Sequence, residues 1–403
     1  MTIVTDSPFR RMIHASAPDF WRLWFVGLII SVVRWLETIA VGVVVYQRTE
    51  SAFAVAMMTM LRLLPMGLFG AFLGAVSERV DRRLTLTIVL LLMAITSTSL
   101  GLLAWAGSLE IWHFALAAFV NGCGWATDNP VRRFMMGEVV GREHMGTAMS
   151  LDVGASNASR MVGPTIGGFL LAFVGIDGVF ALSVVMYGTA IAASIMLRTR
   201  VPPSPGTGSV LARIAEGLHL VKGDKGLMGT LIVTIIYNVF AWPFTSMIPV
   251  IGRDRLGLGA QGIGVLASLD GIGAFAGALV LALWLTPRWY ARAYVGGVVL
   301  YMIMLIVFAM VTSPVIAGAA LLVTGLGGAG FATMQATLVY LAAPAEMRSR
   351  ILGVLSVCIG TGPIGFVWLG WLADTIGAPH ATAVTGGMGL LALAATWRWW
   401  KEI

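Results

Sequence analysis

A set of ionisable side chains lies inside long apolar stretches of this sequence. A charge at the centre of such a stretch costs at least about 2.5–3.5 kcal/mol when the surroundings are lipid. Side chains kept there are therefore candidates for binding a charged ligand or for carrying a proton. The set comprises Arg34, Glu37, Arg62, Asp128, Arg132, Arg133, Asp152, Arg160 and Asp270.

Three of these residues are predicted to form one ion-pair group. Arg34 and Glu37 are spaced i, i+3, so on a helix they share a face. Arg62 falls at a similar depth on the next apolar stretch, counting about 1.5 Å of rise per residue. A Glu37 held between two arginines keeps its charge, and it would be released when an anionic ligand takes over one of them. The alternative is a purely structural triad.

A second group is predicted around Arg132 and Asp152, which stand at similar distances from the turn between their two stretches. Asp128 lies one helical turn deeper, and Arg160 is a second possible neighbour for it. Asp270 has no basic neighbour in its own half of the chain. It is therefore a candidate for binding and releasing a coupling proton, the alternative being a carboxylate that faces water in a central cavity.

The mid-span charges favour an anionic ligand. Arg34, Arg62 and Arg160 fall near the middle of their stretches, and only Glu37 and Asp270 oppose them there. A guanidinium group is always charged and its planar shape suits carboxylate or phosphate. We therefore expect a ligand with an anionic or strongly hydrogen-bond-accepting group rather than a lipophilic cation.

The elements that position these residues follow from composition. The chain has 403 residues, of which 58% are hydrophobic and 11% charged, with a mean hydropathy of +0.89. An ordinary soluble domain is roughly 45–50% apolar and roughly 25% charged. So few charges cannot cover a globular surface, which excludes a soluble enzyme, a disordered chain and a coiled coil. Most of the surface must face lipid.

Hydropathy predicts an all-α integral membrane protein with twelve transmembrane helices in two six-helix bundles. The apolar runs are too long for the alternating strands of a membrane barrel. The helices are expected at 20–46, 52–77, 84–106, 111–136, 147–174, 177–197, 227–251, 261–285, 293–312, 315–342, 350–373 and 379–399.

The distribution of basic residues predicts the orientation. Alternate turns are rich in Lys and Arg, whereas the turns between them hold only Arg48, Arg253 and Arg255. Because basic residues collect in cytoplasmic turns, both termini are expected in the cytoplasm. The first apolar stretch is longer than a signal-peptide core and reads as an uncleaved span.

The longest polar interruption, rich in Pro and Gly, divides the chain. We expect an N-terminal bundle at 1–197, a cytoplasmic linker with an amphipathic helix at 198–226, and a C-terminal bundle at 227–403. A solvated linker helix is the alternative for the second segment. Similar sequences recur near 141–145 and 345–348, ahead of Gly-Pro pairs at 163–164 and 362–363. Two parallel halves with a ligand site between them are a common transporter arrangement.

The turn after the second predicted helix resembles a signature of the major facilitator superfamily, G-x-x-x-D-R-x-G-R-R. It departs from that pattern at Glu78 and Asp81, which stand where the family has Asp and Gly. The resemblance implies a conformational gate whose charges latch the inner ends of the two halves and separate during transport. Charges that serve only membrane orientation are the alternative. The gate residues are Gly74, Glu78, Arg79, Asp81, Arg82 and Arg83.

The fifth predicted helix resembles the G-P-x-x-G-G element of antiporters in the same superfamily. Its residues are Gly154, Asn157, Gly163, Pro164, Gly167 and Gly168. Small residues also allow close helix packing without any transport role, which is the alternative. Together with the segment 128–133 and the Glu-Gly pair at 216–217, the whole chain looks most like the exporter branch that includes enterobactin and macrolide efflux proteins.

The resemblance implies a secondary active transporter of a bacterial plasma membrane, a monomer in the lipid bilayer. It would export a siderophore-, drug- or organic-anion-like small molecule by alternating access, with protons as the coupling ion. We expect no catalytic residues, cofactor, metal or nucleic-acid partner, and the sequence has no phosphate-binding loop for ATP. The alternatives are a proton-coupled importer of a small metabolite, a lipid transporter of the same fold, a channel, and an intramembrane enzyme.

Overall fold

The computed structural model describes residues 18–78, 80–199, 221, 223–344 and 347–403. Those residues form helices and turns without a strand, so the predicted all-α class is confirmed. The first group of helices is α2 (Pro18–Thr49), α3 (Ala52–Glu78), α4 (Arg82–Trp105), α5 (Ile111–Phe173) and α6 (Ile176–Ile195). The second comprises α8 (Lys225–Ile236), η1 (Tyr237–Ala241), η2 (Trp242–Met247), α9 (Ile248–Asp254), α10 (Ala260–Trp284), η3 (Pro287–Trp289), α11 (Tyr290–Met310), α12 (Pro314–Ala342), α13 (Arg348–Ile359), α14 (Gly362–Ile376), α15 (Ala378–Ala395) and α16 (Trp397–Trp400).

Eight segments of the described chain are long and apolar enough to cross a membrane. The helix α5 is 63 residues long and covers two of the predicted spans. Gly141 divides it, because its φ of +71° lies in the left-handed region that a helix cannot continue through. The exposed face of α4 carries Leu91, Ile95, Leu102 and Trp105, as expected of a helix that faces lipid.

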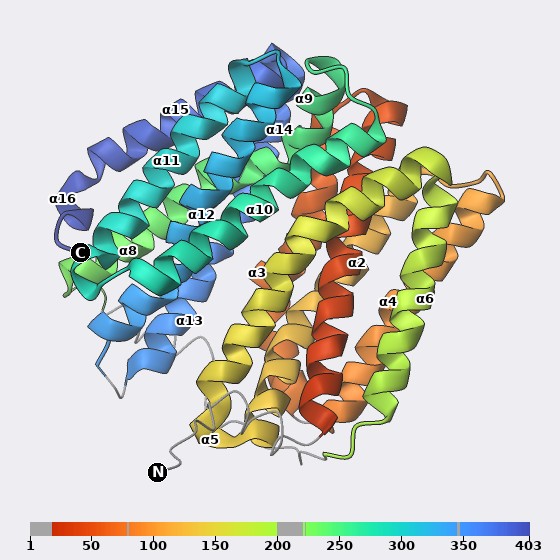
Figure 1. Cartoon of the computed structure of the whole chain (residues 1–403), viewed down its shortest axis with the longest axis horizontal. Coiled ribbons are helices and arrows are strands. Elements are labelled where there is room, and N and C mark those ends of the chain that lie inside the picture. The colour runs from red at the N-terminus through yellow and green to blue at the C-terminus, as the bar shows by residue number, and fades with distance from the viewer. Residues whose placement is uncertain (1–17, 79, 200–220, 222, 345–346) are drawn as a thin grey trace, which may run out of the picture.

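Figure 1 shows two groups of helices, α2–α6 on the right and α8–α16 on the left, which meet near α9 and α10 and diverge below. We call the end where they meet the Tyr46 end, after Tyr46, Ser51, Asp254 and Asp374. The opposite end is called the Arg82 end, after Arg82.

The buried apolar side chains follow the same division. One cluster spans both groups at the Tyr46 end, where Val43 and Val45 of α2 share it with Ile248 and Ile251 of α9. Toward the Arg82 end the first group has its own cluster around Leu86 and the second group has another around Val339 and Ile351. The two groups are therefore joined by one core at the Tyr46 end and have separate cores toward the Arg82 end.

Two predicted helices are interrupted in the structure. The range 227–251 was expected as one helix, but a π-helical segment (η1) and a 3₁₀ segment (η2) separate α8 from α9. Pro243 and Pro249 lie in this stretch and have no backbone N–H to continue an α-helix. The range 350–373 is likewise divided into α13 and α14 next to Gly360, Gly362 and Pro363.

Candidate functional site

A cavity of about 300 Å³ lies between the two groups of helices. The first group contributes charged and aromatic side chains from α2, α3 and α5, among them Trp35 and Trp125. The second group contributes Trp242, Ser246 and Asp270 from η2 and α10. Of the predicted pathway residues, the cavity wall holds Arg34, Glu37, Arg62, Arg160 and Asp270.

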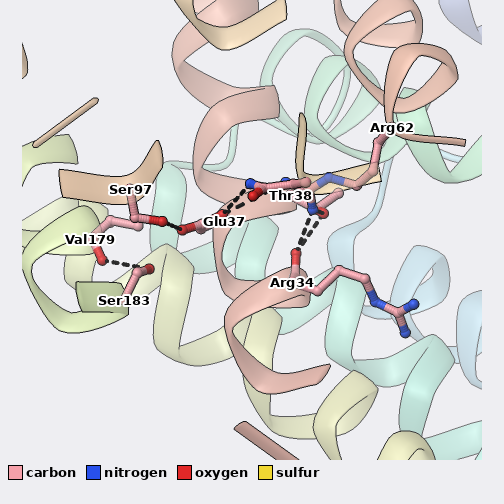
Figure 2. A network of polar contacts seen from close by, with 8 residues as sticks. Arg34, Glu37, Thr38, Arg62, Ser97, Val179 and Ser183 are labelled. Carbon is pink, nitrogen blue, oxygen red and sulfur yellow. Dashed lines mark hydrogen bonds and ion pairs between the residues drawn. The ribbon is translucent and has the colours of Figure 1, made fainter. Parts of the chain in front are cut away.

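Glu37 is the centre of a buried polar network (Figure 2). One of its carboxylate oxygens accepts a hydrogen bond from Ser97 at 2.8 Å and the other from Asn121 at 3.4 Å. The Arg62 guanidinium lies 3.7 Å from the same carboxylate and donates to the hydroxyl of Thr38 at 2.6 Å. The predicted pairing of Glu37 with Arg62 is thus present, and it holds α3 against α2.

Arg34 departs from the predicted triad. Its backbone carbonyl accepts a hydrogen bond from Arg62 at 3.0 Å, but its side chain points away from Glu37 (Figure 2). The guanidinium carbon lies 4.6 Å from the ring centre of Trp125 and 5.3 Å from that of Trp35. The expectation that two arginines flank Glu37 was wrong, because a shared helix face does not fix the rotamer of a long side chain.

Arg160 of α5 forms an ion pair with Asp270 of α10 across the two groups. Asp270 was expected to lack a basic neighbour within its own half, and its partner comes from the other half. Arg160 thus pairs with Asp270 and not with Asp128. Beside this pair, a Cβ on Gly271 would lie 2.5 Å from the backbone oxygen of Arg160, so α5 and α10 approach closely here.

The second predicted group forms as expected. Arg132 is buried and pairs with Asp152, while its Nε lies 3.3 Å from Asp128. Arg133 reaches Asp152 from the more exposed side, at 3.0 Å. These residues lie outside the cavity wall, packed against Gly27 of α2, where a Cβ would lie 2.9 Å from the Arg132 Nε. The structure therefore separates the predicted pathway into a cavity set and this second group.

The glycines of the antiporter-like element lie at helix contacts. A Cβ on Gly163 would lie 2.7 Å from the Cβ of Trp35, and a Cβ on Gly167 would lie 3.0 Å from the Cα of Leu36 on α2. Gly168 faces the other group, where its Cβ would lie 2.9 Å from the Cα of Gly264. This part of α5 is thus packed between α2 and α10.

The other members of the element differ in their surroundings. Asn157 and Pro164 line the cavity. A Cβ on Gly154 would have open space, with nothing within 4 Å. Gly154 is therefore not required for a close helix contact in this arrangement.

The predicted gate is described in part. Asp81 begins α4, where its carboxylate accepts a hydrogen bond from the Leu84 N–H at 3.0 Å. Its φ of −54° needs no glycine, which accounts for the departure from the family pattern. Arg82 lies 3.7 Å from the ring centre of Phe134, and Arg83 donates to the carbonyl of Ile195, both within the first group.

The side chains of the other predicted gate residues are not described in the structure. Arg79 lies outside the described residues, and Gly74 and Glu78 are described only as helical backbone. The predicted amphipathic helix of the linker also falls outside them, apart from Val221 and the residues that follow 222.

Contacts at the Tyr46 end were not anticipated from the sequence. Asp374 of α14 accepts hydrogen bonds from the Ser51 hydroxyl at 2.7 Å and from the Phe53 N–H at 3.1 Å. The Tyr46 hydroxyl donates to Asp254. The carboxylate of Asp374 thus binds the N-terminus of α3, where backbone N–H groups and the helix dipole favour a negative charge. The sequence indicates that these polar residues lie near turns, but it does not indicate which residue each one contacts.

Among the described residues, no group of three or more His, Cys, Asp and Glu side chains is arranged to hold a metal ion. The chemistry that the cavity offers is that of hydrogen bonds, ion pairs and aromatic contacts. Such a site can bind and orient a ligand.

Residues 6–400 match the family described as transmembrane secretion effector. The chain is 21% identical over 240 residues to macrolide efflux protein A of Streptococcus pyogenes, covering 58% of this chain and 59% of that protein's length. It is 19% identical over 363 residues to the staphyloferrin A transporter of Staphylococcus aureus, covering 88% and 89%. A bacterial homologue of the human lysosomal transporter Spinster, in an inward-facing and unoccupied conformation, has a similar fold, with a TM-score of 0.74, 14% identity and coverage of 96% and 98%.

Proposed function

Because the chain belongs to the major facilitator superfamily, we propose that it exports a small molecule across the bacterial plasma membrane by alternating access and proton antiport. The observation that carries the proposal is the cavity between the two groups of helices, crossed by the Arg160–Asp270 pair. A site built from both halves can be exposed to either side when the halves rock against each other. The exporter direction is supported by the name of the macrolide efflux relative.

We propose twelve spans in two bundles, at 1–197 and 227–403, joined by the segment 198–226. Eight of these spans are the segments of sufficient length and apolar character described above. The other four are α3, the two parts of α5 on either side of Gly141, and α15. The Tyr46 end would face outward and both termini would be cytoplasmic. With one core at the Tyr46 end and separate cores toward the Arg82 end, the arrangement fits an inward-facing monomer.

Proton coupling is assigned to Asp270. A proton on Asp270 would neutralise the partner of Arg160 and weaken the ion pair that joins the two bundles in mid-membrane. In this mechanism Asp270 takes up a proton in one conformation and releases it to the other side of the membrane after the conformational change.

The test uses purified protein in proteoliposomes and a panel of siderophores, macrolides, cationic dyes and organic anions. Asp270→Asn should abolish transport driven by a pH gradient but leave counterflow exchange of the same compound. Asp177→Asn, an exposed carboxylate in the first turn of α6, is the control and should behave as wild type. Loss of both activities, or of neither, in Asp270→Asn would contradict the coupling role.

The direction of transport is tested separately in membrane vesicles. Inside-out vesicles with an acidic interior should accumulate the transported compound, as expected for an exporter that works by proton antiport. Accumulation by right-side-out vesicles with an acidic exterior would instead identify the proton-coupled importer. Gradient-independent movement of lipid would identify the lipid transporter.

A further inference from the structure

We propose that Arg34 is the binding group for the carboxylate of a compact organic anion, which would be the substrate class of the exporter proposed above. The proposal rests on that function for its biological meaning, but its geometry stands by itself. Arg34 lies in the cavity wall between the two groups of helices.

Arg34 lacks a carboxylate partner, in contrast to the other arginines deep in the described helices. Arg62 lies beside Glu37, Arg132 pairs with Asp152, and Arg160 pairs with Asp270. No described carboxylate lies within ion-pair distance of Arg34, and its buried Nε makes no hydrogen bond. A buried donor left without a partner is destabilising and calls for an explanation. A bound anion would supply that missing partner.

The surroundings of Arg34 keep its charge available. Trp125 and Trp35 offer their ring faces to the guanidinium, a contact that attracts a cation without occupying its hydrogen-bond donors. Arg160 lies 5.5 Å from the ring centre of Trp35 and adds positive charge nearby, although its own donors face Asp270. The cavity wall holds Arg34, Arg62 and Arg160 against Glu37 and Asp270, and this excess of positive charge favours an anion over a lipophilic cation.

The size and walls of the cavity limit the ligand further. A volume of about 300 Å³ is at the lower end of the range of roughly 300–1,000 Å³ that small-molecule sites occupy. Besides Trp35 and Trp125, the wall contains Trp242 from the second group. The fitting ligand has one carboxylate on a compact apolar or aromatic body.

The test compares three probes of one shape: 1-naphthoate, its neutral amide, and the cationic 1-naphthylmethylammonium. Binding to the purified full chain is measured by calorimetry or by quenching of tryptophan fluorescence. Since hydrogen bonds to charged groups are worth about 1.5–3 kcal/mol, naphthoate should bind wild type about tenfold more tightly than the amide. The cation should bind most weakly.

Arg34→Gln should reduce the affinity for naphthoate about tenfold and leave the affinity for the amide nearly unchanged. Arg34→Lys should retain part of the preference, because it keeps the charge but loses the planar donor pair. Arg288→Gln, which alters an exposed arginine of η3 outside the cavity wall, is the matched control and should bind like wild type. The melting temperature of Arg34→Gln should change little, since the side chain has no ion pair to lose and only its contacts with two tryptophan rings are removed.

The proposal would be overturned if wild type bound naphthoate and the amide with equal affinity, or if it did not bind naphthoate at millimolar concentration. It would also be overturned if Arg34→Gln kept the wild-type preference for naphthoate over the amide. A marked fall in the melting temperature of Arg34→Gln would also count against it, by showing a structural role. Failure of the exporter proposal looks different: the anion preference and its loss in Arg34→Gln would persist while wild type showed no gradient-driven transport.

Discussion

At the scale of single residues, the buried arginines fall into two kinds. Arg132 lies between Asp128 and Asp152 with its charge matched on both sides. Arg34 rests on two tryptophan rings without an acid. The first arrangement serves stability, because removing one partner of a buried pair leaves an unmatched charge. The second is suited to binding.

This difference leads to a stability prediction. Asp152→Ala should lower the free energy of unfolding by about 3–5 kcal/mol, because Arg132 would keep its charge in a buried position with one partner fewer. Denaturant unfolding in detergent micelles measures the change. Asp177→Ala, which alters an exposed carboxylate, should have little effect. A stability of Asp152→Ala equal to that of wild type would show that the pair is not structural.

Part of this residue-level arrangement could be predicted from the sequence. Depth along neighbouring antiparallel helices was enough to pair Glu37 with Arg62 and Arg132 with Asp152. It could not pair Arg160 with Asp270, because that contact depends on how two bundles meet. Neither could it orient Arg34, whose long side chain has several rotamers on the same helix face.

At the scale of helices, the contact between α5 and α10 depends on glycine. Gly168 and Gly264 bring the two backbones together, and Thr165 adds hydrogen bonds to Ser268 at 2.7 and 3.1 Å. Small residues at such crossings let helices associate closely in lipid. The antiporter-like element therefore has a clear packing role at the contact between the bundles.

A matched pair of variants tests that role. Gly168→Ala should loosen the Tyr46 end and lower the melting temperature, because the new Cβ would lie 2.9 Å from the Cα of Gly264. Gly154→Ala, with nothing within 4 Å of its Cβ, should be neutral or stabilising by up to about 1 kcal/mol. Equal melting temperatures for the two variants would contradict the importance of the contact.

Helix positions were predictable and helix interruptions were not. Long apolar runs with Gly and Pro between them place most helix ends within a few residues, as for 52–77 against α3 (Ala52–Glu78). The change to π and 3₁₀ geometry in η1 and η2 has only Pro243 and Pro249 as a sequence signal. A proline marks a weak point in a helix, but which alternative winding replaces it depends on packing against neighbouring helices.

At the scale of the whole molecule, the two ends should act in opposition. Asp374 holds α3 to α14 at the Tyr46 end, whereas the resemblance to the superfamily assigns Glu78 to a latch at the Arg82 end. Alternating access requires that one end opens as the other closes.

We therefore predict opposite shifts in conformational populations. Asp374→Asn should lengthen the distance across the Tyr46 end, because a neutral amide binds the α3 N-terminus more weakly. Glu78→Gln should shorten that distance by favouring the state closed at the Tyr46 end. Nitroxide labels at Ser108 and His380, with Cys123 and Cys358 replaced by serine, measure it by electron spin resonance. Shifts in the same direction, or unchanged distances in both variants, would refute the opposed latches.

The winding of the segment between α8 and α9 has a mechanical consequence. A π-helix is underwound relative to an α-helix and a 3₁₀-helix is overwound, and here the two follow one another directly, as η1 and η2. The two segments therefore change the helical twist between α8 and α9 in opposite senses. Trp242 and Ser246 line the cavity from η2. A change in the winding of this segment would therefore move part of the cavity wall directly, without a rotation of the whole bundle.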